Sequence, residues 1–330
     1  MKKALIYILI FSMLAVTLAG CSSEKAQTEA SPIRLAALTG PTAIGMAKIF
    51  RDTDEGTADV AYSTQLFGTA DEIVPLILQG NIDIASIPLN LASVLYNKTE
   101  GGAVLLAADV LGVLYIGEFN GSTVNSLADL KGQTIYATGK GAVPEIFLRY
   151  ILTENGIDPD TDLTIEWKSE PGEIIALLNA KQSGIAMLPQ PYATAAKVQL
   201  GEGYRTVFSL SEEWDALGTP GRCITAGVIV RREFLQENPQ LVAAFLQDLE
   251  ESVLWANDDP ADAAAVCEKL GFAKAAVIEK AIPQCNLVCI TGEEMQEAVS
   301  QCLTVQFDFS PAMVGGALPG DDFYYITEEN

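Results

Sequence analysis

Short apolar segments alternate with amphipathic helical segments from Ile33 onward, and this alternation constrains the fold most strongly. Residues 33–38 predict a strand, and a helix opens at Pro41, because proline suits the first turn of a helix. The same order of strand, turn and helix returns at residues 133–155. Strands separated by helices are typical of an α/β fold, so we expect mixed sheets flanked by helices.

Two stretches of the chain share one pattern. A turn at Thr39 leads, 49 residues later, to a strand that ends at Pro88. A turn at Thr138 leads, 51 residues later, to a strand that ends at Pro189. This similarity predicts two similar lobes rather than one continuous sheet, and chance likeness between α/β units is the alternative. Further strands are expected at 59–64, 82–87, 163–167 and 185–188, and helices at 69–80, 144–155, 173–181, 239–257, 273–282 and 293–304.

The first 21 residues predict export. Lys2 and Lys3 precede an apolar run, which ends in Leu18-Ala19-Gly20-Cys21. A basic start, a short apolar segment and small residues before a cleavage point are typical of a signal peptide. The ending resembles the bacterial lipobox, in which cleavage leaves a lipidated cysteine at the new N-terminus. We therefore expect a signal peptide at 1–20, a lipidated tether at 21–32 and an extracytoplasmic protein anchored to the membrane through Cys21. An ordinary signal peptide with an incidental cysteine is the alternative.

Composition excludes several classes of function. The formal charge is −23, and loss of Lys2 and Lys3 with the leader would make it −25, so we expect no nucleic-acid partner. The chain contains no histidine, which excludes Ser-His-Asp and Cys-His catalysis and histidine-based metal sites. We expect no enzymatic activity, no cofactor and no metal. Beyond Cys21 the cysteines are expected as disulfides or as buried free thiols, and their spacing is not a standard zinc pattern: Cys223, Cys267, Cys285, Cys289 and Cys302.

Four motifs carry a resemblance to a known family. They are the turn Thr39-Gly40-Pro41-Thr42-Ala43, the segment Gly80-Asn81-Ile82-Asp83-Ile84-Ala85, the segment Leu127-Ala128-Asp129-Leu130-Lys131-Gly132, and Pro189-Gln190-Pro191. With the lipoprotein leader, they resemble the solute-binding proteins of ABC importers, and among these the nitrate/sulfonate/taurine and thiamine-precursor binding proteins. The resemblance runs from about Ile33 to Tyr325, and no motif in it fixes the ligand.

The resemblance implies a two-lobed type II periplasmic-binding fold with a ligand cleft between the lobes. Lobe one is expected at 33–119 and 227–326, and lobe two at 120–226. The crossovers between the lobes are expected near 117–123 and near 223–227. Ligand-induced closure of such lobes is a hinge motion.

Ligands of α/β proteins bind beyond the carboxyl ends of strands, where helix N-termini offer free N–H groups. Threonines and amides there supply hydrogen bonds, Lys140 suits an anionic group, aromatic rings stack, and Arg222 is expected to meet the ligand or an acid of the other lobe. Tyr115 is a further aromatic candidate, although a core role is the alternative. The expected ligand-binding residues are Thr39, Gly40, Pro41, Thr42, Phe67, Gly68, Thr69, Pro88, Asn90, Thr138, Gly139, Lys140, Gly141, Pro189, Gln190, Tyr192 and Arg222.

The resemblance implies a monomeric receptor that captures a small molecule and delivers it to the permease and ATPase of an ABC importer. A small anion such as a sulfonate, nitrate or taurine and a heterocycle such as a thiamine precursor both remain candidates. The alternative function is a lipoprotein that senses a ligand for a signalling partner or serves a non-ABC uptake system.

Overall fold

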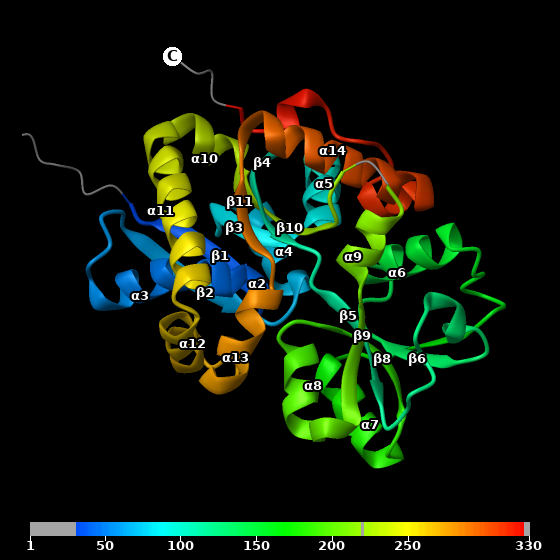
Figure 1. Ribbon diagram of the computed structural model, residues 1–330. Helices are drawn as coiled ribbons and strands as arrows, with labels where there is room; N and C mark the ends of the chain where they lie inside the picture. The colour runs from blue at the N-terminus through cyan, green and yellow to red at the C-terminus, as the bar shows by residue number, and fades with distance from the viewer. Residues whose placement is uncertain (1–30, 219–220, 327–330) are drawn as a thin grey trace, which may run out of the picture. The chain divides into compact units, whose positions relative to one another are not determined.

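The computed structural model describes residues 31–218 and 221–326, which form two sheets (Figure 1). The first sheet has the strand order β11-β4-β10-β3-β1-β2, and the second has the order β7-β6-β8-β5-β9. Both mix parallel and antiparallel pairs, which confirms the predicted α/β fold with two mixed sheets. The strands are β1 (Ile33–Leu38), β2 (Tyr62–Phe67), β3 (Ile84–Pro88), β4 (Ala103–Leu111), β5 (Leu114–Phe119), β6 (Thr134–Ala137), β7 (Thr164–Trp167), β8 (Gly184–Pro189), β9 (Tyr204–Ser209), β10 (Ile224–Arg231) and β11 (Leu287–Ile290).

Helices cover both faces of each sheet (Figure 1). One face of the first sheet carries α2 (Pro41–Gly45), α3 (Ala47–Glu55), α11 (Pro239–Asp258), α12 (Pro260–Lys269) and α13 (Ala275–Ala281). Its other face carries α4 (Ala70–Leu78), α5 (Leu89–Lys98) and α14 (Gly292–Phe309). The second sheet lies between α6 (Val143–Glu154) with α9 (Leu210–Ala216) and α7 (Pro171–Lys181) with α8 (Tyr192–Leu200). The remaining helices are α10 (Arg232–Glu237), η1 (Leu127–Leu130), η2 (Gly201–Gly203), η3 (Ile282–Gln284), η4 (Pro311–Val314) and η5 (Asp321–Phe323).

Most of the expected elements are present, with shifted ends. The strand expected at 59–64 begins instead at Tyr62, because the register of the sheet pairs Tyr62 with Ile33 at the start of β1. The capping box expected at Thr69 is present: the Thr69 N–H donates to Glu72 over 3.0 Å. A hydroxyl and a carboxylate so placed satisfy N–H groups that the first turn of a helix leaves unpaired.

The chain passes between the sheets at other places than expected. β5 belongs to the second sheet, where it pairs with β8 and β9. The first passage therefore lies between Leu111 and Leu114, and the crossover predicted near 117–123 was wrong. The chain leaves the second sheet at Ser209 and returns at Ile224, so most of the second passage precedes the expected position. The exact extent of each lobe stays a proposal.

The aspartate of the Gly80–Ala85 motif is a structural clamp at the opposite ends of the strands. Asp83 is buried and accepts hydrogen bonds from the backbone N–H of Arg34 and from its Nε, at 3.0 and 2.8 Å. Arg231 on β10 donates to the same carboxylate over 2.9 Å. These guanidinium groups hold the pKa of Asp83 below its usual value, although burial opposes them. Asp83 therefore fixes the register of β1, β3 and β10.

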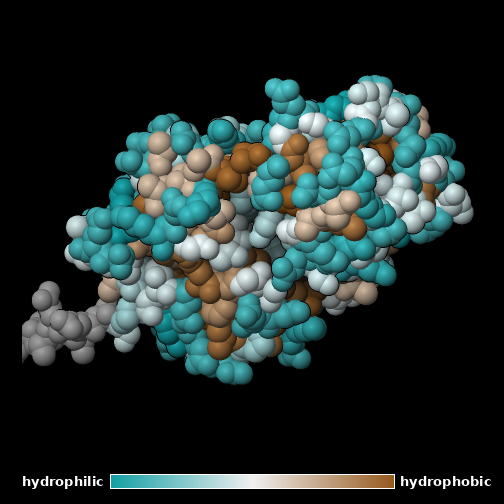
Figure 2. All heavy atoms as spheres, turned by 90° about the horizontal axis from the view of Figure 1, so that it is seen from below, coloured by the Kyte–Doolittle hydropathy of each residue, from teal (hydrophilic) through white to brown (hydrophobic). Residues whose placement is uncertain are grey.

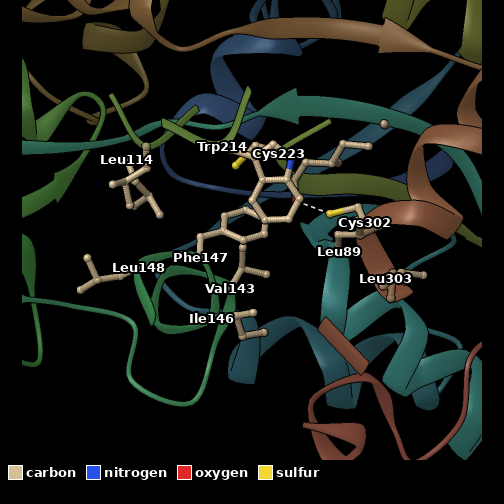
Figure 3. Packing of buried hydrophobic residues seen from close by; sticks show 14 of the residues in the cluster. Leu89, Leu114, Val143, Ile146, Phe147, Leu148, Trp214, Cys223, Cys302 and Leu303 are labelled. Atoms are coloured by element: carbon tan, nitrogen blue, oxygen red, sulfur yellow. Dashed lines mark hydrogen bonds between the residues drawn. The ribbon is translucent and has the colours of Figure 1, made fainter. Parts of the chain in front are cut away.

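The largest apolar cluster joins side chains that flank both sheets. Trp214 of α9 packs edge-on against Phe147 of α6, with ring centroids 5.1 Å apart (Figure 3). Cys302 and Leu303 of α14, which covers the first sheet, belong to the same cluster (Figure 3). Among residues 31–218 and 221–326, no helix combines the length and apolarity that a membrane span requires.

Candidate functional site

Three parallel strands of the first sheet end at one edge, and the turns beyond them contain many of the predicted binding residues. β1 pairs with both β2 and β3, and Leu38 lies opposite Phe67. The N–H of Thr39 donates to the carbonyl of Phe67 over 2.9 Å, which joins two of the turns. Such a carboxyl edge is the usual place for a ligand in an α/β fold. The predicted residues at this edge are Thr39, Gly40, Pro41, Thr42, Phe67, Gly68, Thr69, Pro88 and Asn90.

The second sheet offers an equivalent edge. β6 and β8 run parallel, with Ile135 opposite Ile185, and their carboxyl ends lead into the remaining turns. Gly139 has a positive φ of 83°, and a Cβ there would lie 2.6 Å from Pro144, so the turn requires glycine. The predicted residues at this edge are Thr138, Gly139, Lys140, Gly141, Pro189, Gln190 and Tyr192.

The two edges meet in a small cavity. It has a volume of about 70 Å³, and Thr39 and Gly40 line it from the first edge, Pro191 and Tyr192 from the second. Its other walls are apolar side chains of α2, of α8, of the loop between α12 and α13, and of α13 itself. These residues are Ile44, Ala195, Phe272, Ala273, Val277 and Ile278. Figure 2 shows apolar side chains reaching the surface beside a hollow near the middle of the face seen from below. Ligand cavities commonly exceed about 300 Å³, so this cavity is smaller than a typical ligand site.

A cavity of about 800 Å³ lies beside the passages between the sheets and was not predicted. Leu111 lines it next to the first passage, and Arg222 and Cys223 line it next to the second. Gln284 and Asn286 contribute amides. Two predicted binding candidates, Arg222 and Tyr115, line this cavity, but most of its other walls come from β9 and α9, which were not predicted as elements.

Two of the predicted turns are capped from within. Glu72 Oε2 accepts from the N–H groups of Gly68 and Thr69, at 3.1 and 3.0 Å. Glu145 Oε2 accepts from the N–H of Gly141 over 2.7 Å, and Arg149 donates to its other oxygen over 2.8 Å. These carboxylates occupy N–H groups that the sequence analysis assigned to a ligand.

The two predicted amides are both buried and both hydrogen-bonded to distant segments. Asn90 Nδ2 donates to the carbonyl of Met313 over 3.3 Å. Gln190 is 2% exposed; its Nε2 donates to Gln284 Oε1 over 2.8 Å, and its Oε1 accepts from the Thr194 hydroxyl. Asn90 Oδ1 has no hydrogen-bond partner among the described residues. The amides thus hold segments of the fold together, a role that the sequence analysis did not assign to them.

The predicted cations differ in their surroundings. Lys140 is exposed, and the described residues provide no ion-pair partner for it. Arg222 forms an ion pair with Glu294 of α14 over 3.0 Å, and both side chains are largely exposed. Tyr115 is buried, and its hydroxyl donates to the carbonyl of Gln284 over 2.9 Å. Tyr192 remains 41% exposed beside the small cavity.

Several titratable groups lie in the core. Asp109 on β4 accepts a hydrogen bond from the Ser86 hydroxyl, and burial raises its pKa to about 7. Burial also raises the pKa of the Cys267 thiol to about 12. The cysteines of the described residues are free thiols, and within that part of the chain no group of three or more Cys, Asp or Glu side chains is placed to hold a metal ion. Cys21 lies outside the described residues.

Three solved structures illustrate the similarity of this fold to known proteins. An ABC transporter protein of Parabacteroides distasonis has a TM-score of 0.75 at 23% identity, covering 91% of this chain and 99% of its own. The periplasmic aliphatic sulphonate binding protein SsuA of Escherichia coli has a TM-score of 0.71 at 16% identity, covering 91% and 94%. The periplasmic nitrate-binding protein NrtA of Synechocystis has a TM-score of 0.59 at 14% identity, covering 84% and 81%.

Sequence comparisons point the same way. The nitrate/nitrite binding protein NrtA of Synechococcus elongatus is 25% identical over 200 residues, which are 58% of this chain. This chain spans only 42% of the length of that relative. The model of the NMT1-like family matches residues 55–271. Since that match covers well over half of the chain, the chain belongs to the NMT1-like family, and its two-lobed fold is that of ABC-transporter periplasmic binding proteins.

Proposed function

We propose that the chain is a solute-binding receptor that captures a small molecule between its two sheets and delivers it to the permease and ATPase of an ABC importer. The observation that carries this proposal is the meeting of the two carboxyl edges. Thr39 and Gly40 from one edge and Pro191 and Tyr192 from the other line a single cavity. A ligand between them would contact both lobes and stabilise their closed arrangement. Membership of the NMT1-like family supports the same role.

The proposal includes an extracytoplasmic location and a monomeric protein with a lipid anchor on Cys21. The basic, apolar and small-residue order of the leader supports this anchor. Several acyl chains would hold the protein firmly, since each buried CH₂ contributes about 0.8 kcal/mol. A ligand-sensing lipoprotein for a signalling partner or a non-ABC uptake system is the second candidate, because the same closure could be read by either partner.

No catalytic role is proposed. The chain contains no histidine, the side chain that most often serves as a general base. The candidate ligands remain a sulfonate, nitrate or taurine-like anion and a heterocycle similar to a thiamine precursor.

A thermal-shift screen of the full chain tests the proposal. At a hundredfold excess over Kd, a ligand stabilises the native state by about 2.7 kcal/mol. Sulfonates, nitrate, thiamine precursors, other heterocycles and amino acids form the panel. Tyr192→Ala should weaken the binding of any stabilising compound tenfold or more, because Tyr192 lines the cavity. Val198→Ala is the matched control on the same helix, since Val198 is 50% exposed and does not line that cavity. Equal effects of the two substitutions would contradict a site at this place.

A further inference from the structure

Carboxylates of the protein already occupy N–H groups at two helix starts beyond the carboxyl edges of the sheets. Anions bind at helix N-termini because free N–H groups and the helix dipole stabilise negative charge there. At the start of α4, Glu72 accepts from Gly68 and Thr69. At the start of α6, Glu145 accepts from Gly141. The protein itself therefore supplies the anion at the starts of α4 and α6, two helices that follow the carboxyl ends of strands in the two sheets.

At the other helix starts, single donors are missing or already engaged. The N–H of Thr194 in the first turn of α8 donates to Gln190 Oε1 over 3.3 Å. At the start of α2, Pro41 has no N–H to give, and Pro88 lacks one just before α5. A buried anion needs several good donors, because its desolvation is otherwise uncompensated.

The charges of the turns argue in the same direction. Residues 39–43, 67–72, 88–90, 138–145 and 189–194 contain one lysine, Lys140, against the carboxylates Asp71, Glu72 and Glu145. Lys140 is exposed, and Arg149 is engaged by Glu145 and by Asp160, at 2.8 Å each. Arg149 balances Glu145, and no charged residue lines the small cavity, so the cavity itself supplies no positive charge to balance a buried anion.

The same carboxylates are poorly placed to bind a cation. Glu72 is satisfied by the N–H groups of its own turn, and Glu145 by Gly141 and Arg149. A cation would have to replace these hydrogen bonds and would lie near Lys140. Neutral groups remain available instead, namely the Thr39 side chain at the first edge, Thr138 at the second, and the half-exposed ring of Tyr192.

From these contacts we infer that the cleft takes a polar molecule without net charge at neutral pH. This inference rests on the proposed function and narrows it. An uncharged ligand would differ from nitrate and sulphonate, the anions in the names of two structural neighbours. Binding to such a molecule would depend on hydrogen bonds and ring contact, so it should be insensitive to salt.

The test uses a deproteinised yeast extract, supplemented with nitrate and butanesulfonate, as the probe. The full chain is unfolded in guanidinium, refolded to remove bound small molecules, and checked by circular dichroism. Thermal shifts are then measured with the whole extract, with the fraction retained by an anion exchanger, with that retained by a cation exchanger, and with the unretained fraction, all at pH 7.5.

We expect the unretained fraction to give the shift of the whole extract. A shift confined to either retained fraction would overturn the inference and leave the receptor function standing. Absence of a shift with the whole extract would overturn the receptor function and the inference with it.

Two further measurements use the stabilising fraction. Between 0.05 and 0.5 M salt, the concentration required for half of the shift should change less than twofold. Lys140→Ala should change it less than threefold, as should the control Lys131→Ala, whose lysine pairs with Asp162 away from the turns. A tenfold or larger loss in Lys140→Ala alone would show that Lys140 binds an anion and would contradict the inference.

Discussion

Replacement of Asp109 by asparagine should stabilise the protein, and the gain should grow with pH. Asp109 is 3% exposed, accepts from the Ser86 hydroxyl, and has a second oxygen, Oδ1, without a partner among the described residues. Burial raises its pKa from 3.8 to about 7. The folded protein therefore retains a proton that the unfolded chain has already lost at neutral pH. Asparagine keeps the shape and the hydrogen bond to Ser86 but has no charge to bury.

The sign and size follow from proton linkage. When folding raises the pKa of a carboxyl group, the free energy of unfolding of the protein falls as pH rises from the unfolded pKa to the folded pKa. The fall is complete above the folded pKa. Each unit of difference corresponds to about 1.4 kcal/mol, so the whole effect is roughly 4 kcal/mol. Only part of it is present at pH 5, so the advantage of Asp109→Asn over the parent should increase by roughly 2–3 kcal/mol between pH 5 and pH 8.

Urea unfolding of the full chain, followed by circular dichroism at both pH values, measures this difference. Asp54→Asn is the matched control, because Asp54 is an exposed carboxylate on α3. Its free energy of unfolding relative to the parent should change by less than about 0.5 kcal/mol between the two pH values. If the advantage of Asp109→Asn is the same at pH 5 and pH 8, or is negative at pH 8, burial does not control the ionisation of Asp109.

Two other substitutions test the packing. Asp83→Ala leaves the guanidinium groups of Arg34 and Arg231 without their carboxylate, so we expect the free energy of unfolding in urea to fall by roughly 3 kcal/mol. This loss should be smaller at low pH, because protonation of Asp83 there weakens the same ion pairs in the parent protein. Tyr204→Phe removes a hydroxyl that is buried and has no hydrogen-bond partner among the described residues, so we expect a gain of about 1 kcal/mol. A destabilised Tyr204→Phe would show that a water molecule or another group satisfies this hydroxyl.

Local patterns predicted the elements whose stability is itself local. β1 begins and ends as expected, and the capping box at Thr69 joins residues three positions apart. The prediction of the first crossover between the sheets was wrong because, in the sequence alone, Gly112 and Gly117 are equally good candidates for ending a strand. A Cβ at Gly112 would lie 1.9 Å from the Ser211 hydroxyl oxygen, and one at Gly117 would lie 2.0 Å from that of Tyr204. Both glycines are required by packing partners far along the chain, and only the pairing of β5 with β8 shows which one lies inside a strand.

The candidate site also has a part that the sequence predicts and a part that it does not. The turns were predictable, because the ends of parallel strands must gather at one edge of a sheet. The roles of Asn90 and Gln190 were not, because their partners Met313 and Gln284 lie 223 and 94 residues away. The sequence does not distinguish an amide that contacts a ligand at the end of a strand from one that contacts a distant loop. Its hydrogen bonds decide between the two: both ends of the Gln190 amide are bonded within the fold, whereas Asn90 is bonded through Nδ2 alone.

The glutamates at the starts of α4 and α6 link helix stability to the choice of ligand. A carboxylate in the first turn stabilises a helix because it satisfies N–H groups and interacts favourably with the dipole. The same property makes those N–H groups unavailable to any other anion. Glu72 and Glu145 do this beyond strands of different sheets. Under the proposed function, an uncharged molecule would leave these carboxylates with their present hydrogen-bond donors, whereas an anion would have to compete with them.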